Sequence, residues 1–121
     1  MSSTLKITVL QNQGDEHVAV LHLKGELDGS NYKDLQAKVD EVIAGNTNKI
    51  IIDMSGLSFM GSAGLRALHT SAKSTKENGG SVKLVKPSDA AQRVLKTLGF
   101  DQFFEVYDEL EDAIDSFLEE A

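Results

Sequence analysis

The sequence predicts an α/β fold: a single domain in which a mixed β-sheet with an N-terminal hairpin has about four helices packed on it. Three observations support this prediction. Apolar and polar residues alternate in two stretches near the N-terminus, as they do in the strands of a hairpin. Strand-like and helix-like stretches then alternate to the end of the chain. The 121 residues fit one domain, 1–121, and no repeat, low-complexity tract or linker divides them.

The predicted hairpin consists of strands at Leu5–Leu10 and at residues 17–24. A polar turn at residues 11–16 separates them and contains a glycine. Both faces of the second stretch are fairly apolar, which favours a central strand. Residues 25–30 have the composition of a loop, so we expect the strand to end before them.

The first helix is expected at residues 31–44, where apolar residues form one stripe and Ser30 or Asp28 precedes as a cap. A strand follows at residues 49–54. Its three consecutive isoleucines are apolar on both faces, which indicates helices on both sides. The later elements are a connection at 55–61, a helix at 62–77, a strand at 81–85, a helix opened by Pro87 and Ser88, a strand at 103–106, and a last helix with Asp108 and Glu111 at capping-box spacing.

The composition excludes several classes of function. The formal net charge of −7 disfavours nucleic acid and anionic membranes as partners, and it favours a partner with a basic docking face. The chain has no cysteine, which excludes disulfides and thiol chemistry. No apolar run is long enough for a bilayer and no secretory signal is apparent, so a cytoplasmic location is expected.

Motifs for catalysis are missing from the sequence. No Walker-type phosphate loop occurs, and the glycine pair Gly61 and Gly64 is too short for a dinucleotide fingerprint. Ser62 does not lie in the Gly-x-Ser-x-Gly pattern of hydrolases. The three histidines are His17, His22 and His69. They lack metal-ligand spacing, so we interpret them as strand-face or helix-surface residues. We therefore expect no cofactor, no metal and no enzymatic activity.

The most informative stretch is residues 53–65, where a buried-type strand leads through a short loop into a helix. Ser62 is expected at or near the N-cap of this helix, where free N–H groups and the helix dipole favour negative charge. A phosphate on Ser62 would be tolerated there. Gly61 and Gly64 leave the hydroxyl accessible, and Arg66 follows one turn later. Spacing alone favours an ordinary capping serine at position 62 and an ordinary solvated charge at Arg66.

Two motifs at a characteristic separation resemble a known family. Gly-Glu-Leu-Asp at residues 25–28 and Ile-Ile-Asp-Met-Ser-Gly-Leu-Ser-Phe-Met-Gly-Ser-Ala-Gly-Leu at residues 51–65 resemble the STAS domain of bacterial anti-sigma factor antagonists. The resemblance covers almost the whole chain. It implies that the unmodified protein binds an anti-sigma factor serine kinase and thereby releases a sigma factor. The kinase would then phosphorylate Ser62, and a serine phosphatase of the metal-dependent type would restore the active form.

The resemblance also implies a docking surface around Ser62. It places Asp28 beside the phosphorylated serine, although a turn or helix-start role for this residue stays open. Apolar side chains flanking the site suggest a small patch for the kinase, with core packing as the alternative for at least one of them. The partner-binding residues expected on this basis are Asp28, Phe59, Met60, Gly61, Ala63, Gly64, Leu65 and Arg66.

The chain departs from the resemblance at Gly61, because these antagonists usually have Asp immediately before the modified serine. This departure keeps a second reading open. A constitutive STAS interaction module, such as a signalling scaffold or a transporter accessory subunit, would bind its partner whether or not Ser62 is intact.

Overall fold

The computed structural model describes residues 4–11 and 17–119 and confirms the predicted α/β fold. Five strands of this described part form one sheet in the order β1-β2-β3-β4-β5. Strands β1 and β2 pair antiparallel as the N-terminal hairpin, and every later pair is parallel. The strands are β1 (Leu5–Leu10), β2 (Val18–Leu27), β3 (Lys49–Met60), β4 (Ser81–Val85) and β5 (Glu105–Tyr107). The predicted turn at 11–16 lies, apart from Gln11, outside the described residues.

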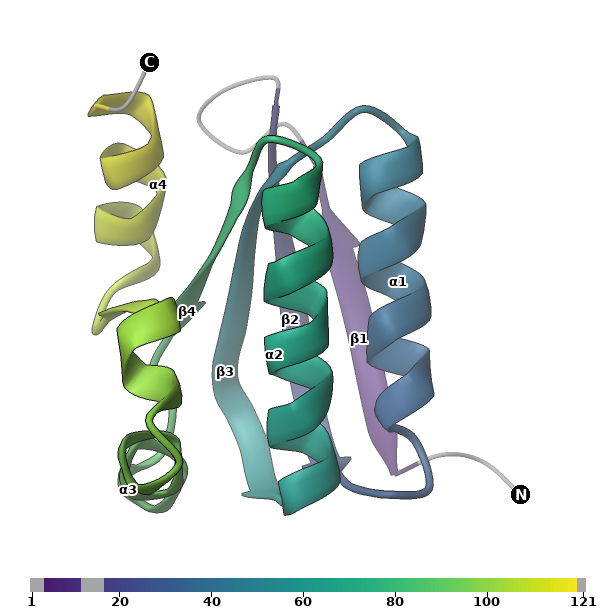
Figure 1. Ribbon diagram of the computed structural model, residues 1–121, viewed down its shortest axis with the longest axis vertical. Helices are drawn as coiled ribbons and strands as arrows, with labels where there is room; N and C mark the ends of the chain where they lie inside the picture. Colours follow the sequence, from purple (N-terminus) through teal and green to yellow (C-terminus); the bar gives the residue numbers. More distant parts are fainter. Residues whose placement is uncertain (1–3, 12–16, 120–121) are drawn as a thin grey trace.

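Within the described residues, four α-helices and one 3-10 helix connect and cover the strands. They are α1 (Tyr32–Ala44), α2 (Ser62–Glu77), α3 (Asp89–Thr97), η1 (Phe100–Phe103) and α4 (Leu110–Glu119). Helices α1 and α2 lie side by side in front of the sheet (Figure 1). No helix in the described part of the chain is long and apolar enough to cross a bilayer.

The consecutive isoleucines of β3 divide the core into two layers, as the sequence predicted. Ile50 and Ile52 pack in the large cluster that also holds the buried residues of α1, α2 and α3. Ile51 faces the other side of the sheet, in a smaller cluster with Ala113 and Phe117 of α4. Because side chains alternate along a strand, a strand covered by helices on both faces is mostly apolar at consecutive positions.

The predicted ends of β2 and β3 were wrong. We expected a loop at 25–30 and a connection at 55–61, but β2 continues to Leu27 and β3 to Met60. The two strands stay paired past two irregularities in register, up to Leu27 opposite Met60. Gly25 has a φ of 107°, which only glycine adopts without strain. Polar residues and glycines here mark bulges within strands, and local composition alone does not distinguish these from loops.

Two smaller predictions also differ from the structure. The predicted strand at 103–106 is in fact η1 followed by β5, which begins at Glu105. Helix α1 has Asn31 at its N-cap position, and neither Ser30 nor Asp28 occupies it. Ser88, one of the two residues expected to open the third helix, is the N-cap of α3, and its hydroxyl accepts a hydrogen bond of 3.1 Å from the Ala91 N–H. The capping box at Asp108 and Glu111 stays a prediction.

A pair of polar side chains joins β2 to β3 inside the sheet, and sequence reasoning missed it. His22 Nδ1 lies 2.7 Å from Asp53 Oδ2. Burial raises the pKa of the Asp53 carboxyl, but hydrogen bonds from the backbone and side chain of Ser55 and from His22, together with the charge of His22, outweigh burial. The pKa of Asp53 is therefore lowered from its ordinary value of 3.8.

This lowered pKa predicts how stability depends on pH. Asp53 stabilises the folded state above its unfolded pKa, and this contribution is lost as pH falls through the lower folded pKa. The variant Asp53→Asn has no such proton to bind, so its free energy of unfolding should fall less steeply between about pH 5 and pH 2. Urea unfolding followed by circular dichroism across this range measures the slope for both proteins. Parallel curves for the two proteins would contradict the prediction.

Candidate functional site

The two sequence motifs meet at one edge of the sheet. Strands β2 and β3 run parallel, so their carboxyl ends lie together, at the bottom of the view in Figure 1. The Gly61 N–H donates a hydrogen bond of 2.9 Å to the Leu27 carbonyl. This bond places the end of β2, where the Asp28 turn begins, beside the start of α2.

Ser62 is exposed at the start of α2. The N-cap residue is Gly61, with extended φ and ψ of −84° and 177°, so Ser62 is the first helical residue and does not cap the helix. The first backbone bond of the helix runs from the Leu65 N–H to the Gly61 carbonyl, at 3.2 Å. In the part of the chain that the structure describes, no side chain caps this end. The hydroxyl of Ser62 is therefore accessible next to free N–H groups that favour negative charge.

The two glycines near Ser62 differ in whether the structure requires a glycine there. Gly64 is buried, and a Cβ there would lie 2.8 Å from Leu27 Cγ and 3.0 Å from Met60 Cγ. The first turn of α2 therefore rests directly on β2 and β3, and only glycine allows this approach. A Cβ on Gly61 would meet only Phe59, 3.3 Å from the edge of an exposed ring that can move. Neither φ nor space requires glycine at 61, so the Asp that the resemblance led us to expect there would fit.

Asp28 belongs to a small hydrogen-bonded turn. Its carboxylate accepts hydrogen bonds from the backbone N–H and the hydroxyl of Ser30, at 2.9 and 2.6 Å. These two bonds lower the pKa of Asp28, so the carboxylate is ionised at neutral pH.

Asn31 holds this turn in place, and sequence reasoning missed it. Its side chain accepts from the Asp28 N–H at 3.0 Å and donates to the Glu26 carbonyl at 2.9 Å, while only 3% of the residue is exposed. An Asn at the first position of the predicted helix is the signal that would have indicated such a role, because its amide can both donate and accept.

The structure divides the predicted docking residues by exposure. Phe59, Ser62 and Arg66 are exposed. Gly64 and Leu65 are buried, and Leu65 packs in the main core with 1% of its surface exposed. The half-buried members of the predicted surface are Asp28, Met60, Gly61 and Ala63. The surface open to a partner therefore runs from the Asp28 turn across Ser62 to Arg66, without Gly64 and Leu65.

The site shows no arrangement typical of a metal centre. Among the described residues, no group of three or more His, Asp or Glu side chains could hold an ion. His22 pairs with Asp53, and His69 packs against Phe100, so these two histidines lie on separate elements.

Comparison with known proteins agrees with this architecture. Residues 9–113 match the model of the STAS domain family. The anti-sigma-F factor antagonist RsfB of Mycobacterium tuberculosis is 33% identical over 113 residues, which cover 92% of this chain and 88% of RsfB.

Solved structures show the same fold. An anti-sigma factor antagonist from Mycobacterium paratuberculosis superposes with a TM-score of 0.80 at 27% identity, covering 93% of this chain and 92% of that one. The antagonist SpoIIAA in its unphosphorylated form superposes with a TM-score of 0.79 at 24% identity, covering 93% of this chain and 96% of that one. At this identity the similarity supports the fold alone. Anti-sigma factor antagonists are regulators and not enzymes. The chain belongs to the STAS domain family of anti-sigma factor antagonists.

Proposed function

We propose that this protein is a cytoplasmic partner switch controlled at Ser62. In its unphosphorylated form it binds an anti-sigma factor that is also a serine kinase, and binding releases the sigma factor. The kinase then phosphorylates Ser62 and the complex separates. A serine phosphatase of the metal-dependent type removes the phosphate. The observation that carries this proposal is the exposed Ser62 hydroxyl at an uncapped helix start, beside the Asp28 turn.

The local electrostatics account for a switch without refolding. A phosphate adds a charge of about −1.5 to −2, and the N-terminus of a helix stabilises such a charge. Arg66 lies exposed one turn after Ser62, where it can contribute a further hydrogen bond. The domain therefore accommodates the modification, whereas a partner docked over Ser62 meets a new charge beside the ionised Asp28. Repulsion at the contact separates the partners while both stay folded.

A second function is a constitutive STAS interaction module, as a signalling scaffold or a transporter accessory subunit. The observation that favours it is Gly61, where the family usually has Asp. Such a module would bind its partner through the same edge without modification of Ser62.

Phosphate mapping distinguishes the two functions. The purified protein is incubated with Mg-ATP in a lysate of its host, digested with trypsin and sequenced by mass spectrometry. Cleavage after Lys49 and Arg66 leaves Ser55, Ser58 and Ser62 in one peptide, so fragment ions must assign the position. We expect one phosphate at Ser62, lost in Ser62→Ala and retained in Ser58→Ala. An unmodified Ser62, with a partner that co-purifies equally with Ser62→Ala, would favour the constitutive module.

A further inference from the structure

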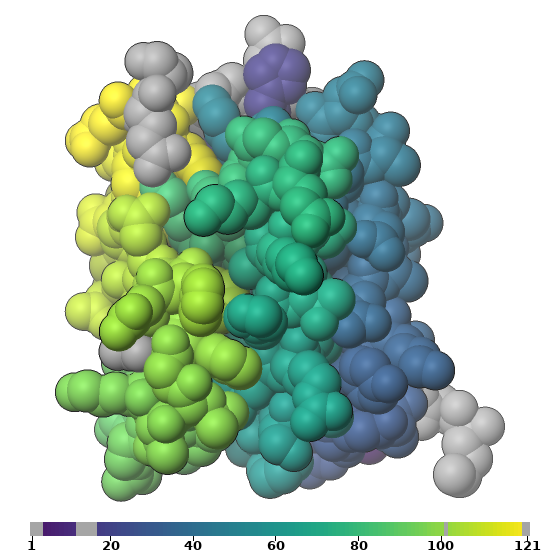
Figure 2. Space-filling model, viewed as in Figure 1, coloured from purple at the N-terminus to yellow at the C-terminus, as the bar shows by residue number. Residues whose placement is uncertain are grey.

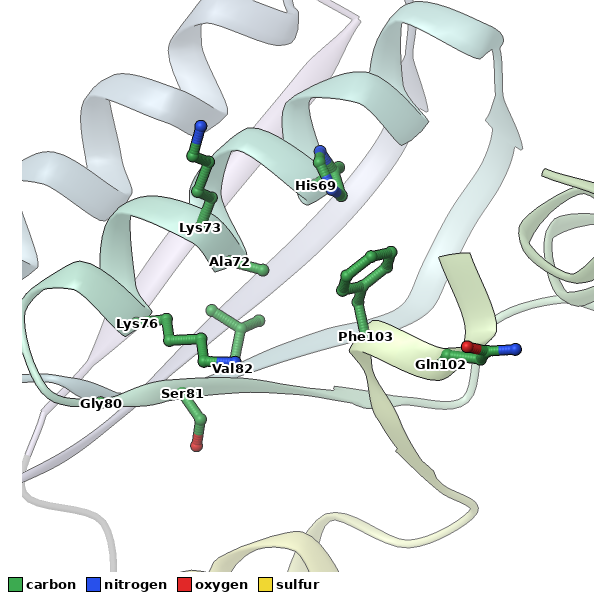
Figure 3. Close-up of a pocket in the computed structure, with 9 residues that line it drawn as sticks. All are labelled: His69, Ala72, Lys73, Lys76, Gly80, Ser81, Val82, Gln102 and Phe103. Atoms are coloured by element: carbon green, nitrogen blue, oxygen red, sulfur yellow. The ribbon is translucent and has the colours of Figure 1, made fainter. Parts of the chain in front are cut away.

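A groove of about 540 Å³ lies along the second half of α2, away from Ser62. Helix α2 forms one side, the start of β4 forms the floor, and η1 forms the other side (Figure 3). Ala72 and Val82 make the floor apolar, and Phe103 stands over it with 59% of its surface exposed. A volume of this size is typical of sites that bind a ligand or a partner's side chains.

The aromatic wall of the groove is held in place. The ring of His69 stacks on Phe100, with centroids 4.7 Å apart and an interplanar angle of 14°. The same ring meets Phe103 edge-on at 5.1 Å and 77°. Phe103 is therefore exposed, yet its ring is held by the contact with His69. Binding would then cost little free energy for ordering this side chain.

Positive charge follows the same helix. Ser62, Arg66, His69, Lys73 and Lys76 are spaced by four, three, four and three residues, which places them on one stripe about 21 Å long. We call these five residues the α2 stripe. Figure 2 shows α2 running along the face turned to the viewer.

No carboxylate interrupts this stripe. Glu77 is the only acidic residue of α2, and it lies about 100° around the helix from Lys76. None of the described residues that line the groove is acidic. Lys76 lies along the groove beside Val82, and the Lys73 ammonium group points away from Val82 at the rim (Figure 3). In a chain of net charge −7, the three cations of α2 thus all lie on this one stripe.

We infer that the groove and the α2 stripe bind an acidic segment of the partner protein, with one apolar side chain of that segment seated against Phe103. Carboxylates of the segment would pair with Arg66, Lys73 and Lys76, and the apolar side chain would cover Ala72 and Val82. The stripe begins at Ser62 and is longer than a small ligand, which favours an extended polypeptide. The identification of the partner as the anti-sigma factor rests on the proposed function. The inference that the groove binds an acidic segment does not depend on it.

A peptide titration tests the groove by itself. The ¹⁵N-labelled full chain is titrated with blocked Glu-Glu-Leu-Glu-Glu, with Glu-Glu-Ser-Glu-Glu and Lys-Lys-Leu-Lys-Lys as controls. We expect saturable amide shifts at residues 69–76 and 102–103 with the first peptide, and at least about threefold weaker binding with each control. The inference is wrong if the first peptide causes no saturable shift there. It is also wrong if inorganic phosphate produces the same shifts and competes with the peptide, because the site would then take a small anion.

Charge reversal tests the groove in the complex. Lys73→Glu/Lys76→Glu should weaken binding to the anti-sigma factor about tenfold, with a larger loss at low salt. Lys6→Glu/Lys38→Glu on β1 and α1 makes the same change of net charge and should stay within about twofold. Equal binding by both variants, while Ser62→Asp still weakens binding about a hundredfold, overturns this inference and leaves the proposed function standing. If the wild-type protein binds no anti-sigma factor, the proposed function fails. The peptide titration then decides whether the groove binds an acidic segment.

Discussion

Ser62→Asp is expected to weaken binding to the anti-sigma factor about a hundredfold, or about 2.8 kcal/mol, because like charges facing each other at a contact cost several kcal/mol. The new carboxylate lies at the start of α2 on the same edge as the ionised Asp28. Ser62→Ala keeps the exposed surface uncharged and should bind within about threefold of the wild-type protein. Titration calorimetry with the purified partner measures both affinities.

The matched control for Ser62→Asp is Ala37→Glu, which adds one negative charge on the exposed side of α1. It should leave the affinity unchanged within about twofold, because Ala37 lies on α1 outside the proposed docking residues and an isolated exposed charge contributes little. A hundredfold loss with both variants would mean that net charge, and not the position of Ser62, controls binding. Full affinity of Ser62→Asp would remove the basis for a switch at this residue.

Gly25→Ala is expected to lower the free energy of unfolding by about 3 kcal/mol and the melting temperature by about 10 °C. Gly25 has a φ of 107°, a conformation that a residue with a Cβ adopts only under strain. A Cβ there would also overlap the carbonyl oxygen of Thr4. The Glu26 N–H donates a hydrogen bond of 3.2 Å to this same carbonyl, so the clash would displace the strand that leads into the Asp28 turn.

Gly29→Ala provides the control for Gly25→Ala. Gly29 lies four residues later in the exposed turn, its φ is not in the left-handed region, and a Cβ added there would meet no atom within 4 Å. The free energy of unfolding of this variant should change by less than about 1 kcal/mol. Urea unfolding at neutral pH compares the three proteins. Equal stability of Gly25→Ala and Gly29→Ala would show that the backbone at Gly25 can relax, contrary to the structural argument.

The sequence by itself determined the order and type of the elements and the place of Ser62. Local patterns carry this information: three isoleucines in a row indicate a strand buried on both faces, and helical spacing of apolar residues indicates α1 and α2. Ser62 follows such a strand and precedes such a helix, so its position at the helix start was predictable. The resemblance to the STAS family added the role of this serine as a hypothesis.

Only the tertiary structure decided how far β2 and β3 extend and which docking residues stay exposed. The paired ends at Leu27 and Met60 depend on hydrogen bonds between segments far apart in the chain. Local composition reflects only residues close together in the sequence. Gly64 and Leu65 follow Ser62 closely, yet they are buried because α2 lies against Leu27 and Met60. The groove beside Phe103 likewise exists only where α2, β4 and η1 come together. Periodicity along one segment is set by its own residues, but packing between segments is set by the assembled sheet.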